Sequence, residues 1–146
     1  MKAYLSRRYR FSASHRLHTD AYDAAKNRAV FGKCNNPHGH GHNYTVQVTL
    51  GGQVDPATGM VCNLADLDSF AEKYLLARFD HTNLNTLECF KNVVSTTENL
   101  TVEIYRIFEN FTAARLEHVH VEETSNNSFD YAGGALPAPA KISGTI

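Results

Sequence analysis

The chain has 146 residues, of which 42% are hydrophobic and 20% charged, and its formal net charge is −1. This length and composition are typical of one globular domain with a single core, and the near-zero charge argues against a general polyanion-binding protein. No stretch has the apolar character of a signal peptide or a membrane span. The three cysteines lack the spacing of a disulfide scaffold, so we expect a reduced, cytoplasmic protein.

The first predicted strand covers about residues 3–13 and alternates between apolar and polar side chains, with Phe11 and Ala13 on its apolar face. His15 has the same parity and is expected to point toward the core if the strand continues that far. A loop of about twenty residues follows. It is longer than most connections, which suggests a functional role.

The segment 33–48, KCNNPHGHGHNYTVQV, places one cysteine and three histidines within nine residues. His38, His40 and His42 occupy alternate positions, and the apolar residues that follow keep the same parity. This pattern predicts a half-buried strand whose histidines lead onto its apolar face. Turn signals at 55–59 end the strand, and we interpret residues 60–63 as a short return strand.

Two helices are expected next. The first begins after Asn63, a good capping residue, and continues with apolar residues at helical spacing to about position 78. The second opens at a capping-box pattern, STTE at 95–98. Residues 115–124, RLEHVHVEET, return to strand alternation, and the aromatic residues in 129–131 indicate a last short strand.

This order of elements predicts an α+β fold with a four-stranded antiparallel sheet and two helices packed on one face. The domain is expected to span residues 1–132, and residues 133–146, rich in Gly, Ala and Pro, to form a mobile C-terminal tail. A small open sheet leaves two unpaired edges. Pairing of these edges between subunits would remove them, so we expect a homo-oligomer.

Four histidines of one parity form a candidate metal site. His15, His40 and His42 are the main set, with His38 as a rival for either neighbour. Three neutral imidazoles suit zinc in tetrahedral geometry and leave a fourth position open. A lone histidine is more often an ordinary core or surface residue, and that interpretation is kept for His18, His118 and His120.

Three other positions carry candidate chemistry. Cys34 is either a fourth zinc ligand, which closes the site, or a nucleophile or base beside an open one. Asp80 and His81 are adjacent in FDHTNLN, and an Asp–His pair that orients and activates a thiol is a common relay arrangement. Glu123 ends an otherwise apolar strand face and is either a solvated strand end or a buried anchor.

With these residues identified, the chain resembles the 6-pyruvoyltetrahydropterin synthase family from about Phe11 to Tyr131. The resemblance is carried by FSASHRL, VFGKCNNPHGHGHNY, DPATGMV, FDHTNLN, VVSTTEN and VEETSNN, in that order along the chain. The cysteine–histidine block is specific to the family. The other motifs are individually weak, and they support the resemblance through their number and their order. The resemblance implies a tunnelling fold, in which three subunits join their sheets into a barrel and two trimers stack as a homohexamer.

The resemblance also implies a reaction, the conversion of 7,8-dihydroneopterin triphosphate to 6-pyruvoyltetrahydropterin and inorganic triphosphate in tetrahydrobiopterin biosynthesis. It implies one zinc ion per subunit, with Mg²⁺ assisting through the substrate triphosphate. The family's functional residues correspond here to zinc ligands His15, His40 and His42, a catalytic Cys34 with the pair Asp80 and His81, a pterin-anchoring Glu123, and pocket residues Thr96 and Thr97.

One departure from the family concerns His38, where animal members usually carry another residue. The sister family, 6-carboxytetrahydropterin synthase of queuosine biosynthesis, places its His-x-His pair two residues nearer the cysteine, a spacing that His38 and His40 match. Counted back from the VDP turn, the second ligand falls at His42 in both families, which favours His40 and His42. The carboxy enzyme stays as the alternative function. A non-catalytic zinc- or pterin-binding protein with a closed Cys-His₃ site is a third hypothesis.

Overall fold

The computed structural model describes residues 1–134, so most of the predicted tail, 135–146, lies outside the described residues. One mixed sheet runs through the molecule in the order β3-β1-β2-β4-β5. Its two long central strands pair antiparallel along their whole length, and shorter strands flank them. The strands are β1 (Lys2–His15), β2 (His40–Gln53), β3 (Thr82–Asn83), β4 (Arg115–Thr124) and β5 (Asn127–Tyr131).

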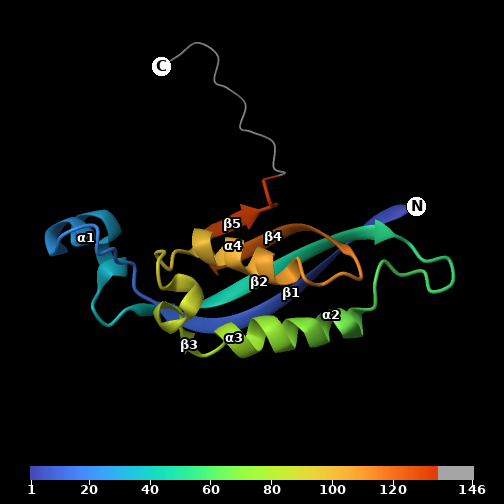
Figure 1. The fold of residues 1–146 in the computed structure, drawn as a ribbon, viewed down its shortest axis with the longest axis horizontal. Helices are drawn as coiled ribbons and strands as arrows, with labels where there is room; N and C mark the ends of the chain where they lie inside the picture. Colours follow the sequence, from blue (N-terminus) through green and yellow to red (C-terminus); the bar gives the residue numbers. More distant parts are fainter. Residues whose placement is uncertain (135–146) are drawn as a thin grey trace, which may run out of the picture.

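Helices form a layer on one face of this sheet, and one further helix lies at the end of the molecule, apart from that layer (Figure 1). A π-helical turn, Glu72–Leu76, joins α2 and α3 into one continuous rod. The helices are α1 (Ala24–Phe31), α2 (Leu64–Ala71), α3 (Ala77–Phe79) and α4 (Thr97–Phe108). None of the helices in residues 1–134 is long and apolar enough to cross a membrane.

The core forms where the apolar faces of the strands meet the helices. Phe11 of β1 lies opposite Tyr44 of β2, and Val46 lies opposite Val121 of β4, so alternate positions of all three strands face the same side. The rod α2–α3 and helix α4 bury their apolar stripes against this side. The predicted arrangement, two helical segments on one face of an antiparallel sheet, is therefore confirmed in its class.

Three details of the prediction are wrong. The sheet has five strands rather than four, because the two-residue β3 pairs in parallel with Ala13 and Ser14. A strand of two residues is too short to show an alternation of apolar and polar side chains in the sequence. Residues 60–63 form no return strand; the chain there leads out of a turn in which the Asp55 N–H bonds the Met60 carbonyl. The long loop after β1 contains α1, and the side chain of its N-cap residue, Asp23, accepts the Lys26 N–H.

One of the two predicted helix N-caps is confirmed and the other is wrong. Asn63 caps α2 as expected, by accepting the Ala65 N–H. Helix α4 is capped by Thr96, which accepts the Asn99 N–H, and not by Ser95, the first residue of the capping-box pattern. Ser95 is buried instead and is used by the site described next.

Candidate metal and catalytic site

Three histidines converge where β1 ends and β2 begins. His15 lies directly opposite His40 in the antiparallel ladder, and His42 lies opposite Ala13, so all three rings project from the core face. The ring centroids are 4.8–5.1 Å apart and the rings are nearly perpendicular to one another. One potential ligand atom from each ring lies within 4.8 Å of the others.

The hydrogen bonds around these rings leave nitrogen lone pairs inside the cluster. His15 Nδ1 lies 2.7 Å from the Ser95 carbonyl oxygen, which can only accept, so this nitrogen carries the proton and Nε2 is free. That Nε2 lies 3.1 Å from His40 Nε2. His42 Nε2 is buried without a hydrogen-bond partner. Burial is also the main reason why the pKa values of His15 and His42 are below the usual value, which favours neutral, metal-binding imidazoles.

The cluster fits a divalent metal ion. Nitrogen ligands at about 2.0–2.1 Å from a tetrahedral ion lie roughly 3.3 Å from one another, close to the observed His15–His40 separation. An ion would also satisfy the orphaned His42 nitrogen, whose burial without a partner is otherwise unfavourable. These three residues therefore have the donor type and the spacing that a metal site requires.

His38, the rival ligand, is exposed and lies outside this cluster. It belongs to the turn before β2, where its N–H bonds the Asn36 side chain. The next residue, Gly39, has φ of 70°, and a Cβ there would lie 2.7 Å from the His15 carbonyl oxygen. Only glycine suits that conformation and that close approach, so the backbone turns sharply between His38 and His40.

Cys34 lies in the 3-10 turn Gly32–Asn35, where its carbonyl accepts the Leu17 N–H at 2.8 Å. Its thiol is half-buried, and within residues 1–134 it does not join the three-histidine cluster. Burial raises the pKa of Cys34, and the negative charge of Glu123 raises it further. Both effects favour the protonated thiol over the thiolate.

Glu123 is partly buried rather than fully solvated, since its side chain is 17% exposed. The Thr97 hydroxyl donates to Oε2, and Asn127 Nδ2 donates to Oε1 at 3.3 Å. Burial acts to raise the pKa of Glu123, but these hydrogen bonds and the nearby His42 hold it below its usual value. The ionised carboxylate lies 3.8 Å from His42 Nε2, so it adjoins the histidine cluster. Thr96 serves as the cap of α4.

The side chains of Asp80 and His81 are hydrogen-bonded to each other, but neither is hydrogen-bonded to Cys34. Asp80 Oδ1 lies 2.9 Å from His81 Nδ1 and also accepts the Ser12 N–H at 2.9 Å. The His81 side chain is 80% exposed and lines a hollow with Ser12, Asn43 and the candidate ligand His42. No hydrogen bond or ion pair among the described residues joins this pair to the cysteine.

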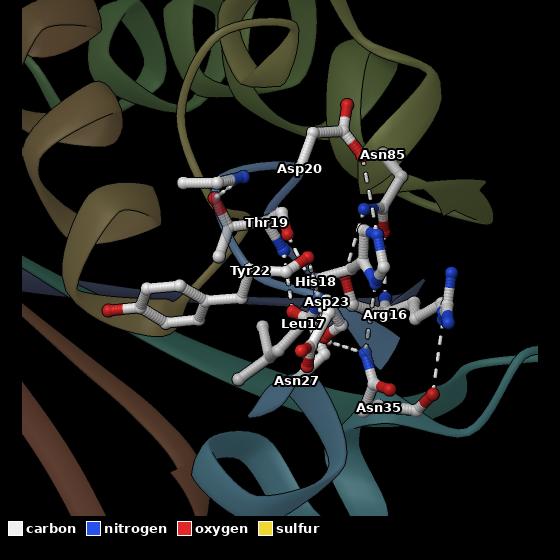
Figure 2. A network of polar contacts seen from close by, with 11 residues as sticks. Arg16, Leu17, His18, Thr19, Asp20, Tyr22, Asp23, Asn27, Asn35 and Asn85 are labelled. Carbon is white, nitrogen blue, oxygen red and sulfur yellow. Dashed lines mark hydrogen bonds and ion pairs between the residues drawn. The ribbon is translucent and has the colours of Figure 1, made fainter. Parts of the chain in front are cut away.

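A network of asparagines, which the sequence analysis did not single out, fixes the segment after His15 (Figure 2). Asn85 accepts the Arg16 N–H at 2.7 Å and donates to the Arg16 carbonyl at 2.9 Å. Asn35 donates to the Leu17 carbonyl at 2.7 Å, and Ser95 donates to Asn85. The network thus connects the end of β1, the Cys34 turn and the Ser95 carbonyl. The NN and NLN motifs contain two of these residues, but polar loop residues give no signal of burial.

Comparisons with known proteins agree on one family. A family model described as 6-pyruvoyl tetrahydropterin synthase matches residues 4–134. Human 6-pyruvoyl tetrahydrobiopterin synthase is 48% identical over 134 residues, which cover 90% of this chain and 92% of that protein. The Drosophila melanogaster protein of the same name is 46% identical over 137 residues, covering 90% and 80%. The solved structure of Caenorhabditis elegans 6-pyruvoyl tetrahydropterin synthase has a TM-score of 0.87 and 41% identity, covering 92% of this chain and 97% of that one.

The geometry predicts which histidine a bound metal requires. His42→Ala should lower the metal content of the purified protein to less than about one tenth of the wild-type value, because it removes one of three ligands. His38→Ala is the matched control and should retain the metal, since His38 lies outside the cluster. Inductively coupled plasma mass spectrometry of the two variants measures the difference. Full metal content in His42→Ala would show that the ligand set is wrong.

Proposed function

The chain belongs to the 6-pyruvoyl tetrahydropterin synthase family, a family of lyases, and we propose that it converts 7,8-dihydroneopterin triphosphate into 6-pyruvoyltetrahydropterin and inorganic triphosphate with the help of zinc. One observation carries the proposal. The carboxylate of Glu123, oriented by Thr97, adjoins a cluster of three imidazoles whose ligand atoms lie within 4.8 Å of one another. An anchor for a pterin and a site for a Lewis acid thus lie side by side.

Glu123 is the proposed pterin anchor. A dihydropterin ring presents an N–H and an exocyclic amine side by side, and an ionised carboxylate accepts both as charge-assisted hydrogen bonds. The hydrogen bonds from Thr97 and Asn127 fix the orientation of the carboxylate. They also favour its ionised form, which is the form that can accept from both groups of the ring.

His15, His40 and His42 are the proposed zinc ligands. When bound there, zinc supplies a Lewis acid for the hydroxyls of the substrate side chain and acidifies the adjacent C–H. The contribution of the protein is to hold the ligands: the Ser95 carbonyl fixes the His15 ring in one tautomer and one orientation. We place Mg²⁺ at the triphosphate of the substrate, because hard phosphate oxygens are the ligands that it prefers.

Cys34 is the proposed base that removes the acidified proton. Its thiol has a raised pKa in the isolated chain, so a nearby cation and an imidazole are needed to generate the thiolate. Asp80 and His81 are the proposed source of that imidazole, but they lie at the edge of the sheet where β3 pairs with β1, and no hydrogen bond or ion pair among the described residues joins them to Cys34. We therefore place the relay at a contact between two subunits, where Cys34 of one copy meets the Asp–His pair of another.

The edges of the sheet support an oligomer of this kind. The outer strands β3 and β5 have only two and five residues, and each leaves an edge that another copy can pair with. We propose a homohexamer of two trimers, in which the joined sheets form a closed barrel. Closure removes the free edges, and it brings residues of different copies together at the subunit contacts.

The reaction itself provides the first test. Purified protein supplied with 7,8-dihydroneopterin triphosphate should release triphosphate and form a product with the mass of 6-pyruvoyltetrahydropterin. Cys34→Ala should slow triphosphate release by about 10³-fold, because it removes the base, while zinc content and pterin binding stay unchanged. A product with the mass of 6-carboxytetrahydropterin would favour the alternative enzyme. Loss of zinc in Cys34→Ala would instead indicate a closed structural site.

The pterin anchor has a matched control on the same strand. Glu123→Ala should weaken binding of dihydroneopterin by about 10²-fold, because two charge-assisted hydrogen bonds are lost, while metal content stays unchanged. Glu122→Ala removes an exposed carboxylate on the other face of β4 and should bind like the wild type. Fluorescence titration gives both dissociation constants. Equal constants for the two variants would contradict the assignment of Glu123.

Mixing two inactive variants tests the relay between subunits. Cys34→Ala and His81→Ala should each be inactive alone, but hexamers assembled from both in equal amounts should regain activity. If each site combines Cys34 of one copy with His81 of another, about one quarter of the sites receive both intact residues. If both residues act from the same chain, no site is intact, and activity that stays absent in verified mixed hexamers would exclude the relay between subunits.

A further inference from the structure

Tyr44 of β2 carries a buried hydroxyl that none of the roles proposed above uses. The residue is 1% exposed, and its ring stacks on Phe11 with the centroids 5.1 Å apart, an ordinary core contact. Its hydroxyl is different, because it is buried without a hydrogen-bond partner in the described part of the chain. A phenylalanine would fill the same space without the cost of an unpaired polar group. The hydroxyl therefore needs an explanation other than packing.

The position of Tyr44 in the sheet places it beside the candidate site. Tyr44 follows His42 by two residues on β2, so both side chains project from the core face, and their ring centroids are 5.6 Å apart. On the neighbouring strand β4, Glu122 pairs with Thr45, and Glu123 is therefore the residue next to Tyr44. Tyr44 thus adjoins both a candidate metal ligand and the proposed pterin anchor.

Thr97 offers the acceptor that this hydroxyl lacks. The Thr97 hydroxyl donates its one proton to Glu123 Oε2, so its oxygen can only accept from a further neighbour. Burial raises the pKa of Tyr44 and the charge of Glu123 raises it further, whereas Thr97 acts against both by side-chain hydrogen bonding. The phenol thus keeps its proton and can donate it. The two hydroxyls are neighbours, although their geometry in this structure falls short of a hydrogen bond.

We propose that Tyr44 is a positioning residue for the pterin anchor, and that its hydroxyl donates to Thr97 Oγ1 when a ligand engages the carboxylate of Glu123. The inference rests on the proposed function. Tyr44 is too deeply buried to touch a ligand itself, so it acts through Thr97. In this chain of donors every proton points toward the carboxylate, and such chains strengthen each of their hydrogen bonds. A hydroxyl that is unfavourable for folding is then retained because it improves binding.

Two tyrosine-to-phenylalanine variants separate binding from stability. Tyr44→Phe should bind dihydroneopterin about fivefold more weakly, because it loses one hydrogen bond of the chain. Its thermal unfolding midpoint should equal or exceed that of the wild type, since an unpaired polar group is removed. Tyr9→Phe is the matched control. The Tyr9 hydroxyl donates to Asp68 at 2.8 Å, so this variant should unfold at a lower temperature and bind within about twofold of the wild type. Fluorescence titration of the zinc-loaded proteins and scanning calorimetry measure the two quantities.

A double-mutant cycle tests whether Tyr44 acts through Thr97. Thr97→Val removes the acceptor, so adding Tyr44→Phe to this variant should change the dissociation constant of dihydroneopterin by less than about 1.5-fold. An equal fivefold effect in both backgrounds would overturn the inference. Wild-type affinity in Tyr44→Phe alone would also overturn it, and this outcome decides the question if Thr97→Val does not fold.

Failure of this inference is distinct from failure of the proposed function. A wild-type protein that releases triphosphate from the pterin substrate, while the cycle shows no coupling, retains the function and loses the role of Tyr44. A wild-type protein that binds dihydroneopterin with the expected coupling, but shows no turnover, retains the role of Tyr44 and loses the function.

Discussion

The pairing register between β1 and β2 is the constraint on which the rest of the site depends. It places His15 opposite His40 and leaves His42 on the same face, and a slip by one residue would turn one strand's histidines to the other face. The same pairing aligns Phe11 with Tyr44 in the core. Burial of these aromatic side chains against the helices therefore selects the register that assembles the imidazoles. The pairing of β1 with β2 thus determines both the burial of the core side chains and the positions of the three histidines.

Hydrogen bonds around His15 connect these strands to the neighbouring loops. The Ser95 carbonyl accepts from His15, and the Ser95 hydroxyl donates to Asn85, which holds both backbone polar groups of Arg16. The start of α4 is thus connected to the candidate metal ligand His15 and to the segment that follows it. Hydrogen bonds of this kind hold the backbone of the segment after His15 in one conformation. The candidate ligand His15 and the Cys34 turn are positioned by one network.

The separation of Cys34 from Asp80 and His81 gives the proposed oligomer a chemical role. Within one chain the Asp–His pair lies at the edge of the sheet beside β3, and no hydrogen bond or ion pair among the described residues joins it to Cys34. The pair is held firmly, since the His81 N–H and the Asp80 carboxylate both bond the backbone of Ser12, and His81 adopts a φ of 58°. A left-handed conformation at a non-glycine residue is unfavourable unless the surroundings enforce it. Such ordering of an exposed side chain is consistent with a role at a contact with another copy.

Alternation by two was enough to predict the long strands and the inward parity of His15, His40 and His42, and helical spacing with capping residues added the α+β class, because both periodicities are local properties of the chain. The residue types marked Cys34, Glu123 and the Asp–His pair as candidates, and the resemblance in sequence motifs suggested their roles. Only the tertiary structure decided that β3 adds a fifth strand, that Ser95 holds His15 rather than capping α4, and that His38 lies apart from the cluster. Each of these depends on contacts between residues far apart in the sequence. A hydrogen bond between positions 15 and 95, or a sharp turn at Gly39, leaves no periodic signal in the sequence, because it arises only when distant segments pack together.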